Sequence, residues 1–536
     1  MSPASLDEID RASLKLQRLR VATDEAPPGC EIMRPSSSTA EPNSWSRAWG
    51  LRSNTRRSAA KTHDGVEANL QLITAPGQLA ASGGVCTIHQ SGPAAAFASS
   101  AIGGVSDVWN ADLRSANRAG ALLYWQQSDP SSILIPQQRM TSDSSVWEDP
   151  ECHFRDNQSV RYQLSRNRVQ EDNVRVYYTV TDVKFNPLRP DVFVSSSFDK
   201  SIRSWSYDKN QKRVHSAWDG YAHEYSAFPQ LLDFKPNSQV LAVGCSDGSC
   251  YFHAPGVEYP QRIKLNSKLR LEVAAQSWGP ESTNASEHFI CGGGMHNENT
   301  PAVADYGWAS AWILRNERAE RVCNFIMGDT AGLYCDDLCV HPAGHCVAIA
   351  STDDDLRFSA RHLVEFFDLR AKPRAIFRQC LPPSSDKNSL ADVLHSGFSP
   401  DGIYYACSRE DNTAQVWDWR WMAKNPKPFQ TIEHQPPDSN GPGHTYGVTA
   451  MTWIDHYGSS SPPVLVTGGN DGKIIQRDMR RSDSHLLAQL ETSVGTFSIG
   501  DRHKDEMPLI AGDCDGKLYI YDVRNGEYGR SAAQLG

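Results

Sequence analysis

The sequence lacks the features of an exported or membrane-spanning protein. No apolar run approaches the length that a membrane helix requires. The first residues, MSPASLDEID, are acidic and polar, whereas a secretory signal would be basic and then apolar. Thirteen cysteines, an odd number spread along 536 residues, are typical of reduced core thiols and not of a disulfide framework. We therefore expect a soluble protein of the nucleus, the cytoplasm or both, with no membrane partner.

The sequence also lacks an excess of positive charge. Its formal net charge is -10, from 53 basic and 63 acidic residues. Non-specific affinity for nucleic acid depends on many uncompensated cations, so we expect no direct nucleic-acid binding. One segment, SRAWGLRSNTRRSAAK, is locally basic and is interpreted either as a nuclear-import or docking segment or as a solvated linker.

The first 65 residues lack the apolar pattern of a folded domain. Residues 23–65 are rich in Pro, Ser, Thr, Ala and Arg, so they bury too little surface to fold and are predicted to be a disordered linker. Within residues 1–22, Ser5 and Glu8 have capping-box spacing and predict a short amphipathic helix. Its apolar face comprises Ile9, Leu16 and Leu19. Such a helix is either marginal in isolation or folds into a partner's groove.

A motif recurs from about residue 179. Each copy has an apolar strand, a turn, a strand ending in small residues, a turn holding Asp, and a strand closing in an aromatic and a polar residue. Examples are VTDVKFNPLRPDVFVSSSFDKSIRSWS, LLDFKPNSQVLAVGCSDGSCYFH and LHSGFSPDGIYYACSREDNTAQVWDWR. This pattern resembles the WD40 family over roughly residues 66–526, followed by a tail at 527–536. The resemblance implies an all-β propeller of four-stranded blades around a central axis.

The number of blades is left at seven or eight, with eight favoured. Seven copies already make a closed ring. Residues 66–126 contain strand-like pieces that form an eighth blade or supply the outer strand that closes the last one. The final copy stops soon after YIYDVR, so its outermost strand should come from the N-terminal part, because an open ring would leave unpaired strand edges. Four segments are predicted to be long loops: 127–170, 294–307, 380–390 and 421–445.

Several motifs imitate catalytic sites. GCSDG, around Ser246, fits the nucleophile elbow of hydrolases, but it falls in a turn between two strands, and GDCDG has the same place in the last repeat. The glycines and Asp are therefore interpreted as a tight turn. The turn Asp recurs, and we expect each to accept backbone N–H bonds: Asp199, Asp247, Asp354, Asp411, Asp471 and Asp515. No enzyme class is supported.

A cluster of cysteines and histidines resembles a zinc site at first sight: Cys335, Cys339, His341, His345 and Cys346. The stretch DDLCVHPAGHCVAIAST predicts two antiparallel strands and a Pro-Ala-Gly turn, and strand alternation sends neighbouring side chains to opposite faces. We therefore expect core thiols and a turn histidine, and neither a metal nor a cofactor.

One histidine is assigned to the fold by resemblance. His444, Thr467 and Asp471 resemble the His, Ser/Thr and Asp of the buried hydrogen-bond network in WD40 blades. Gln476 stands where the usual Trp would complete this network. His444 is therefore interpreted as a structural residue and not as a general base.

Four consecutive blades end alike, with an Arg two residues after an Asp. Strand alternation puts both side chains on the same side, where the guanidinium can pair with a partner's carboxylates or carbonyls. The four endings are Phe367-Asp368-Leu369-Arg370, Trp417-Asp418-Trp419-Arg420, Arg477-Asp478-Met479-Arg480 and Tyr521-Asp522-Val523-Arg524.

These endings resemble the W-D-x-R box in WD40 substrate receptors of cullin-4 ubiquitin ligases, which contacts the damaged-DNA-binding adaptor subunit. Only the repeat with Trp417 keeps the tryptophan. The resemblance implies an adaptor contact through the four arginines, Trp417, Asp418, Asp478 and Asp522, with the N-terminal helix inserted into the adaptor's cleft. The alternative is a chromatin or histone-tail scaffold without ubiquitin function, in which acidic loops near Asp353–Asp355 attract basic peptides.

Overall fold

The computed structural model describes most of the chain between Leu70 and Val523. The described residues are 70–73, 79–101, 119–134, 139–140, 176–217, 223–257, 259–266, 271–281, 283–295, 306–315, 318–327, 334–353, 361–370, 373–382, 392–435, 447–454, 463–479, 484–501 and 504–523. The helix expected in residues 1–22, the linker at 23–65 and the tail at 527–536 lie outside them. No helix among the described residues is long and apolar enough to cross a membrane.

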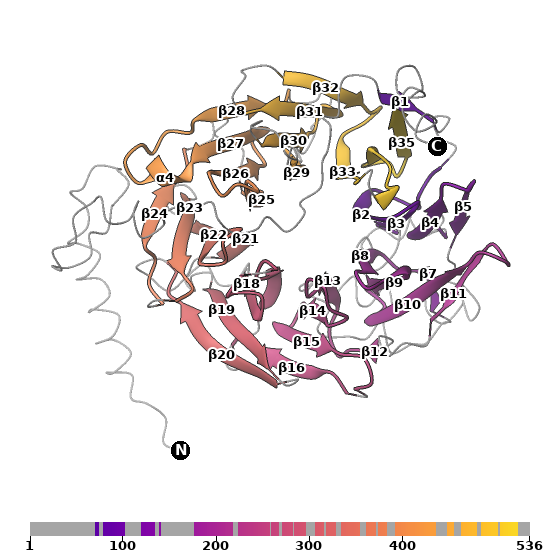
Figure 1. The fold of residues 1–536 in the computed structure, drawn as a ribbon, viewed down its shortest axis with the longest axis horizontal. Helices are drawn as coiled ribbons and strands as arrows, with labels where there is room; N and C mark the ends of the chain where they lie inside the picture. The colour runs from indigo at the N-terminus through magenta and orange to yellow at the C-terminus, as the bar shows by residue number, and fades with distance from the viewer. Residues whose placement is uncertain are drawn as a thin grey trace, which may run out of the picture.

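The strands gather into eight antiparallel blades arranged as a ring around a central axis (Figure 1). Each of the first four blades is named with its strands from the axis outward. Blade 1 has β2 (Val85–Ser91), β3 (Ala94–Ser99), β4 (Leu122–Gln126) and β5 (Asp129–Leu134). Blade 2 has β8 (Val180–Asn186), β9 (Arg189–Ser197), β10 (Ser201–Asp208) and β11 (Arg213–Ser216), with β12 (His223–Glu224) also paired to β10. Blade 3 has β13 (Pro229–Phe234), β14 (Leu241–Cys245), β15 (Ser249–His253) and β16 (Gln261–Lys264). Blade 4 has β17 (Glu272–Trp278), β18 (His288–Met295), β19 (Tyr306–Arg315) and β20 (Arg318–Phe325).

The other four blades follow the same plan. Blade 5 has β21 (Tyr334–Val340), β22 (Cys346–Asp353), β23 (Arg361–Asp368) and β24 (Phe377–Cys380). Blade 6 has β25 (Val393–Phe398), β26 (Tyr404–Arg409), β27 (Thr413–Asp418), the short helix α4 (Trp419–Met422) and β28 (Gln430–Glu433). Blade 7 has β29 (Ala450–Ile454), β30 (Val464–Gly468), β31 (Lys473–Asp478) and β32 (Ser484–Gln489). Blade 8 has β33 (Val494–Ile499), β34 (Leu509–Asp513), β35 (Leu518–Val523) and, as its outer strand, β1 (Leu70–Leu72). A separate pair joins β6 (Arg139–Met140) to β7 (Val176–Tyr177).

The N-terminal part both closes the last blade and forms a blade of its own. In β1, Leu70 pairs with Val523 and Leu72 pairs with Tyr521, and Ile73 donates a backbone hydrogen bond to Ile520 at 2.9 Å. The chain then continues directly into β2 to β5. The sequence posed these two roles as alternatives, whereas the structure combines them and settles the count at eight blades.

The buried apolar side chains of the described residues form eight clusters, and each fills the space between two neighbouring blades. The seam between first and last blade is one of them, because Phe97 and Trp125 of blade 1 pack with Ile510 and Ile520 of blade 8. Every blade therefore has apolar neighbours on both faces. This explains why middle strands such as LAVGC of β14 are buried at every position and show no polar alternation.

Two of the predicted long loops contain regular structure. Residues 127–170 include β5 and β6, and residues 421–445 include the end of α4 and β28. The outer strand of a blade has one face toward solvent, so its sequence is polar and gives a weak strand signal. In β28, for example, only Ile432 of the sequence QTIE is buried. The prediction of a single loop at 421–445 was therefore wrong.

Candidate protein-interaction surface

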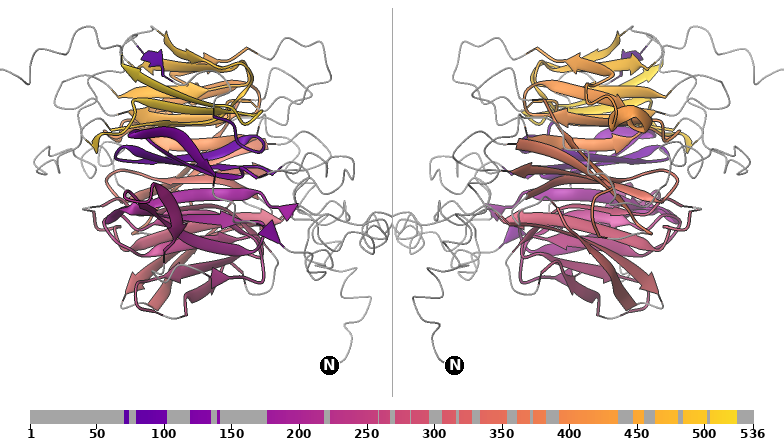
Figure 2. Two further views of the ribbon diagram at one scale, coloured as in Figure 1. Left: turned by 90° about the vertical axis from the view of Figure 1, so that its right-hand side faces the viewer. Right: turned by 90° about the vertical axis from the view of Figure 1, so that its left-hand side faces the viewer.

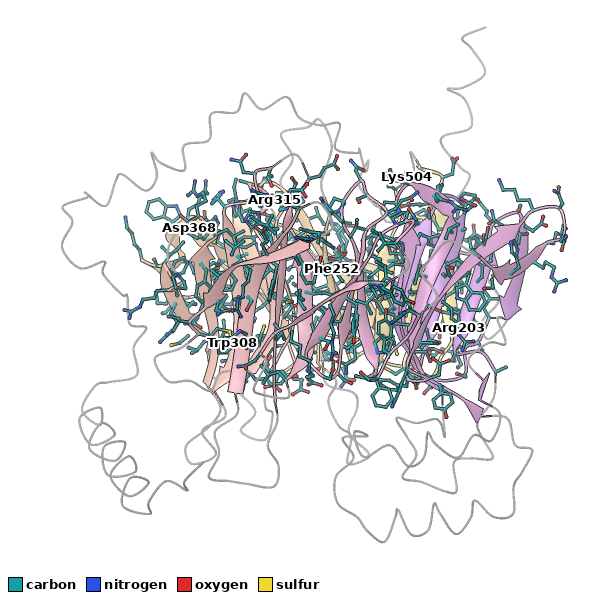
Figure 3. All side chains as sticks on the ribbon, turned by 90° about the horizontal axis from the view of Figure 1, so that it is seen from below. Arg203, Phe252, Trp308, Arg315, Asp368 and Lys504 are labelled. Atoms are coloured by element: carbon teal, nitrogen blue, oxygen red, sulfur yellow. The ribbon has the colours of Figure 1, made fainter. Side chains whose placement is uncertain are left out.

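The two faces of the ring carry different parts of the repeat. In edge-on views the strands cross the thickness of the ring from face to face (Figure 2). Figure 3 shows Asp368 and Arg315, at the ends of the third strands β23 and β19, nearer to one face, which we call the arginine face. Arg203 and Trp308, near the starts of such strands, lie nearer to the opposite face, which we call the turn face.

Two blade-end arginines fold back onto the aspartate two residues earlier. In blade 5, Arg370 donates from Nε to Oδ1 of Asp368 at 3.0 Å and from Nη2 to Oδ2 at 3.1 Å. In blade 6, Arg420 donates in the same way to Asp418, at 2.9 and 2.6 Å. Both aspartates also accept the backbone N–H of their arginine, at 2.9 and 3.2 Å. The same sequence pattern thus gives the same bidentate pair in adjacent blades.

The pairing orients both arginine side chains and favours the charged form of each partner. Burial raises the pKa of Asp368, but the hydrogen bonds and charge of Arg370 outweigh it and leave that pKa below its ordinary value. Hydrogen bonding to the aspartate raises the pKa of Arg370 and of Arg420. The two arginine side chains remain 64% and 47% exposed, so each presents an oriented guanidinium to solvent.

The remaining residues assigned to this surface are two aspartates, two arginines and three apolar residues of the N-terminal segment. Asp478 and Asp522 lie at the ends of β31 and β35, and Asp522 pairs in register with Gln71 of the closing strand. Their arginines, Arg480 and Arg524, lie outside the described residues, as do Ile9, Leu16 and Leu19.

Trp417 is not part of the surface, which corrects its assignment as a partner-binding residue. Its side chain is only 1% exposed, and its indole N–H donates to the carbonyl of Pro426 at 3.1 Å. Trp417 thus packs in the core between blades 5 and 6 and holds the segment that follows α4. The aromatic position before the Asp is inside because the third strand has both faces covered.

Two exposed aromatic residues that follow Arg420 in the chain were not predicted from the sequence. Trp421 is 56% exposed and Phe429 is 54% exposed, although large apolar side chains are usually buried. Lys424 places its ammonium 5.1 Å from the centre of the Trp421 ring. The two aromatic residues were missed because residues 421–445 were interpreted as a loop. The run WRWMAKNPKPF, with aromatic residues among lysines, was the sequence feature that could have indicated an exposed aromatic surface.

The turn aspartates have the predicted structural role at four positions. Oδ1 accepts the N–H two residues later at 3.0 to 3.2 Å in each of Asp199, Asp247, Asp411 and Asp471. In blade 8 the bonding residue is Asp513 instead of Asp515: it accepts from the N–H groups of Asp515 and Lys517. Asp354 lies outside the described residues.

The buried histidine network of blade 7 exists with a different histidine. His434 Nε2 lies 2.9 Å from Thr467 Oγ1, and its Nδ1 lies 2.9 Å from Asp471 Oδ1. His444 lies outside the described residues. Thr467 is completely buried, and so is the side chain of His434, so no substrate reaches this Thr-His-Asp arrangement.

Strand register also corrects the position assigned to Gln476. Trp205 of blade 2 pairs with Phe193, and its indole N–H donates to Ser195 Oγ at 2.9 Å. The equivalent pair in blade 7 is Leu465 with Arg477, since Ser195 corresponds to Thr467. Arg477, and not Gln476, therefore occupies the tryptophan position.

The two remaining motifs lie in the positions that the repeat predicts. Ser246 is 6% exposed in the turn between β14 and β15, and its hydroxyl oxygen accepts the N–H of Phe228 at 3.1 Å. Cys335 belongs to the core between blades 4 and 5, whereas Cys346 belongs to the core between blades 5 and 6. Among the described residues, no group of three or more His, Cys, Asp or Glu side chains is arranged to hold a metal ion.

Comparisons with known proteins agree with this geometry. A family model described as "WD domain, G-beta repeat" matches residues 380–418, which cover β25 to β27 and end at Asp418. The chain is 26% identical over 130 residues to "Protein FIZZY-RELATED 1" of Arabidopsis thaliana, and the match spans 24% of this chain and 23% of that protein. A solved structure titled "Structure of Dos1 propeller" superposes with a TM-score of 0.56 at 16% identity, over 82% of this chain and 93% of that one. The chain is therefore an eight-bladed β-propeller that carries a WD40 repeat in blade 6.

Proposed function

We propose that this propeller is a protein-interaction scaffold and serves as a substrate receptor of a cullin-4 type ubiquitin ligase. The observation that carries the proposal is the repeated pair on the arginine face, Asp368 with Arg370 and Asp418 with Arg420. An arginine already oriented by its own aspartate loses little conformational entropy when a partner binds it. The adaptor subunit binds this face, and a substrate protein binds elsewhere on the ring.

The N-terminal segment supplies a second contact in this proposal. A short helix carrying Ile9, Leu16 and Leu19 inserts into the cleft of the adaptor. An amphipathic helix with an apolar face gains stability when that face is buried in a groove.

Affinity purification followed by mass spectrometry tests the proposal. The wild type is compared with Arg420→Ala plus Arg480→Ala and with a deletion of residues 1–22. The wild type should recover the damaged-DNA-binding adaptor and cullin-4, and both variants should lose them. Absence of both proteins from the wild-type sample would sink the proposal. If both are recovered by all variants, the interface assignment is wrong.

The turn face offers a matched control. Arg262 pairs with Asp247 at 3.0 Å, and its side chain is 43% exposed, close to the 47% of Arg420. Arg262→Ala therefore removes an equally exposed Arg–Asp pair from a turn between the second and third strands. Recovery of the adaptor should be unchanged, because this pair lies on the opposite face.

A specific observation favours a second candidate, a scaffold that binds basic peptides such as histone tails. Three carboxylates act on one another at the turn face. Thr352 donates to Asp336 at 2.6 Å and to Asp392 at 3.5 Å, and the charge of Glu410 acts on Asp336. Burial and then the charge of Asp392 raise the pKa of Asp336 and of Glu410. Crowded carboxylates attract cationic side chains, whose binding relieves the repulsion.

Binding of histone-tail peptides to the full-length protein tests this second candidate directly. Asp392→Asn plus Glu410→Gln should weaken binding of the peptides to the full-length protein, while Arg420→Ala should leave it unchanged. Equal binding by wild type and the acidic-site variant would exclude the turn face as the peptide site. The loop first expected to attract basic peptides, near Asp353–Asp355, lies largely outside the described residues.

A further inference from the structure

The segment between β27 and β28 displays aromatic side chains on a stiff support. Two donors, Trp417 Nε1 and Gln379 Nε2, converge on the carbonyl of Pro426 at 3.1 and 3.2 Å. Asp418 caps α4, and Met422 is 1% exposed. The segment is thus anchored to blades 5 and 6, and the exposure of its aromatic residues is a property of a fixed conformation.

The exposed aromatic residues continue as a row toward the ring axis. The ring of Phe429 lies 5.8 Å from that of Tyr404, which stacks at 6.3 Å on Trp453. Tyr404 and Trp453 are half-buried, and Trp453 belongs to β29, the innermost strand of blade 7. Trp453 is itself fixed by a hydrogen bond from its indole to the carbonyl of Gly397 at 3.1 Å. Aromatic side chains held in this way give a large contact area at a reduced ordering cost.

The charge of this segment opposes that of the whole chain. Between Asp418 and Phe429 there are three cations, Arg420, Lys424 and Lys427, against one carboxylate, which Arg420 already engages. Lys424 and Lys427 are exposed. A protein with a net charge of -10 thus presents a locally positive, aromatic surface. We name Trp421, Lys424, Lys427 and Phe429 the α4 surface.

We propose that the α4 surface anchors an acidic polypeptide segment of a partner protein. Apolar side chains of that segment contact Trp421 and Phe429, and flanking carboxylates pair with Lys424 and Lys427. Trp is among the residues that contribute most to binding energy at protein interfaces, and the two lysines add charge complementarity to an acidic partner. The inference rests on the proposed function in one respect, since both place a partner on the arginine face. A protein segment is favoured over nucleic acid because this surface offers only three cations, Arg420, Lys424 and Lys427, whereas non-specific nucleic-acid affinity is built from many.

Peptide binding to the full-length protein tests the chemistry of the partner. The probes are four classes of short fluorescent peptides: acidic with Leu and Phe, acidic without apolar residues, basic with Leu and Phe, and neutral with Leu and Phe. Fluorescence anisotropy should show the tightest binding for the acidic apolar class. Trp421→Ala plus Phe429→Ala should weaken it about tenfold, as expected for loss of two exposed anchors. The melting temperature should not change, because both side chains lie outside the core.

Two further variants make the assignment specific. Tyr259→Ala removes an aromatic residue that is 74% exposed in the corresponding loop of blade 3, between β15 and β16, and it should leave binding unchanged. Lys424→Glu plus Lys427→Glu should reverse the preference, so that the basic apolar peptide binds more tightly than the acidic one.

Equal binding of all four classes, or no effect of the Trp421 and Phe429 substitutions, overturns the inference. Tighter binding of a single-stranded oligonucleotide that depends on Trp421 overturns it in favour of nucleic acid.

The outcomes separate this inference from the ligase proposal. If wild type recovers no adaptor but the acidic apolar peptides bind at the α4 surface, the ligase proposal fails and the inference stands. If the adaptor is recovered through Arg420 and Arg480 while the four peptide classes bind equally, the ligase proposal stands and the inference about the α4 surface fails.

Discussion

His434 joins two blades, because it follows β28 of blade 6 while its Nε2 lies 2.9 Å from Thr467 Oγ1 in blade 7. Asp471 completes the link by bonding to Nδ1 of the same ring at 2.9 Å. Asp471 also accepts the N–H groups of Lys473 and Gln435. One carboxylate therefore ties a turn of blade 7 to the segment that leaves blade 6.

Asp471→Asn should destabilise the propeller in a pH-dependent manner. Burial raises the pKa of Asp471, but the bond to His434 outweighs it, so the folded-state pKa lies below the ordinary value. The stabilisation is thus full above the unfolded pKa of about 4 and is lost as the pH falls through the folded pKa. At neutral pH the variant should lose about 1–3 kcal/mol. Denaturation curves at falling pH should show this difference shrinking, and a constant difference contradicts the assignment.

The turn of blade 8 separates two neighbouring aspartates. Asp513 is fully buried and also accepts the hydroxyl of Tyr519 at 3.0 Å, whereas Asp515 is exposed. Asp513→Ala should cost about 2 kcal/mol by leaving buried donors unpaired. Asp515→Ala should stay within about 0.5 kcal/mol of wild type. Thermal melts of both variants show which aspartate stabilises the turn. Equal decreases in melting temperature would refute the structural assignment.

The fold was predictable from repetition, whereas individual positions within the repeat were not. The repeat predicted four-stranded blades, turn aspartates and an outer strand supplied by the N-terminal part. It placed the histidine at 444 instead of 434 and the last turn Asp at 515 instead of 513. A motif gives the order of residue types along the chain. It does not say which of two nearby residues of the same type makes the hydrogen bond. Only strand register and side-chain geometry distinguish such candidates.

The sequence predicted only part of the interaction surface. The spacing of Asp418 and Arg420 predicted side chains on one side of the strand end, and the structure places them in a bidentate pair. It did not predict that the pair is formed within the chain, nor that Trp417 is buried while Trp421 is exposed. Burial depends on which blade packs alongside, and that information is not local in sequence.

Two glycines with similar backbone conformations should respond differently to alanine. Gly248 has a φ of 74° and Gly256 a φ of 78°, in the left-handed region that disfavours other residues. A Cβ on Gly248 would lie 2.3 Å from the carbonyl oxygen of Leu271, whereas one on Gly256 would meet no atom within 4 Å. Gly256→Ala should cost about 1 kcal/mol from backbone strain alone. Gly248→Ala should lower the melting temperature clearly more, and equal melts would rule out the steric contribution.

Trp417 should matter for stability and Trp421 for binding. Trp417→Ala leaves a cavity between blades 5 and 6 and removes the donor to Pro426, so it should cost about 3–5 kcal/mol. Trp421→Ala should leave the denaturation midpoint unchanged, since the side chain is 56% exposed. Denaturation of the two variants side by side checks the contrast, and a large loss of stability for Trp421→Ala would place that residue in the core.

Closure of the ring should depend on three residues of β1. Deleting residues 1–73 removes the pairing partners of β35 and exposes its edge, whereas deleting residues 1–22 leaves β1 in place. The longer deletion should therefore lower the melting temperature, and the shorter one should not. Hydrogen exchange gives the local readout: amides of β35 that face β1 should exchange faster in the longer deletion, while those of β27 in blade 6 should be unaffected. Unchanged protection of β35 would mean that the ring is held shut by the core between blades 8 and 1 alone, in which Phe97 and Ile520 pack together.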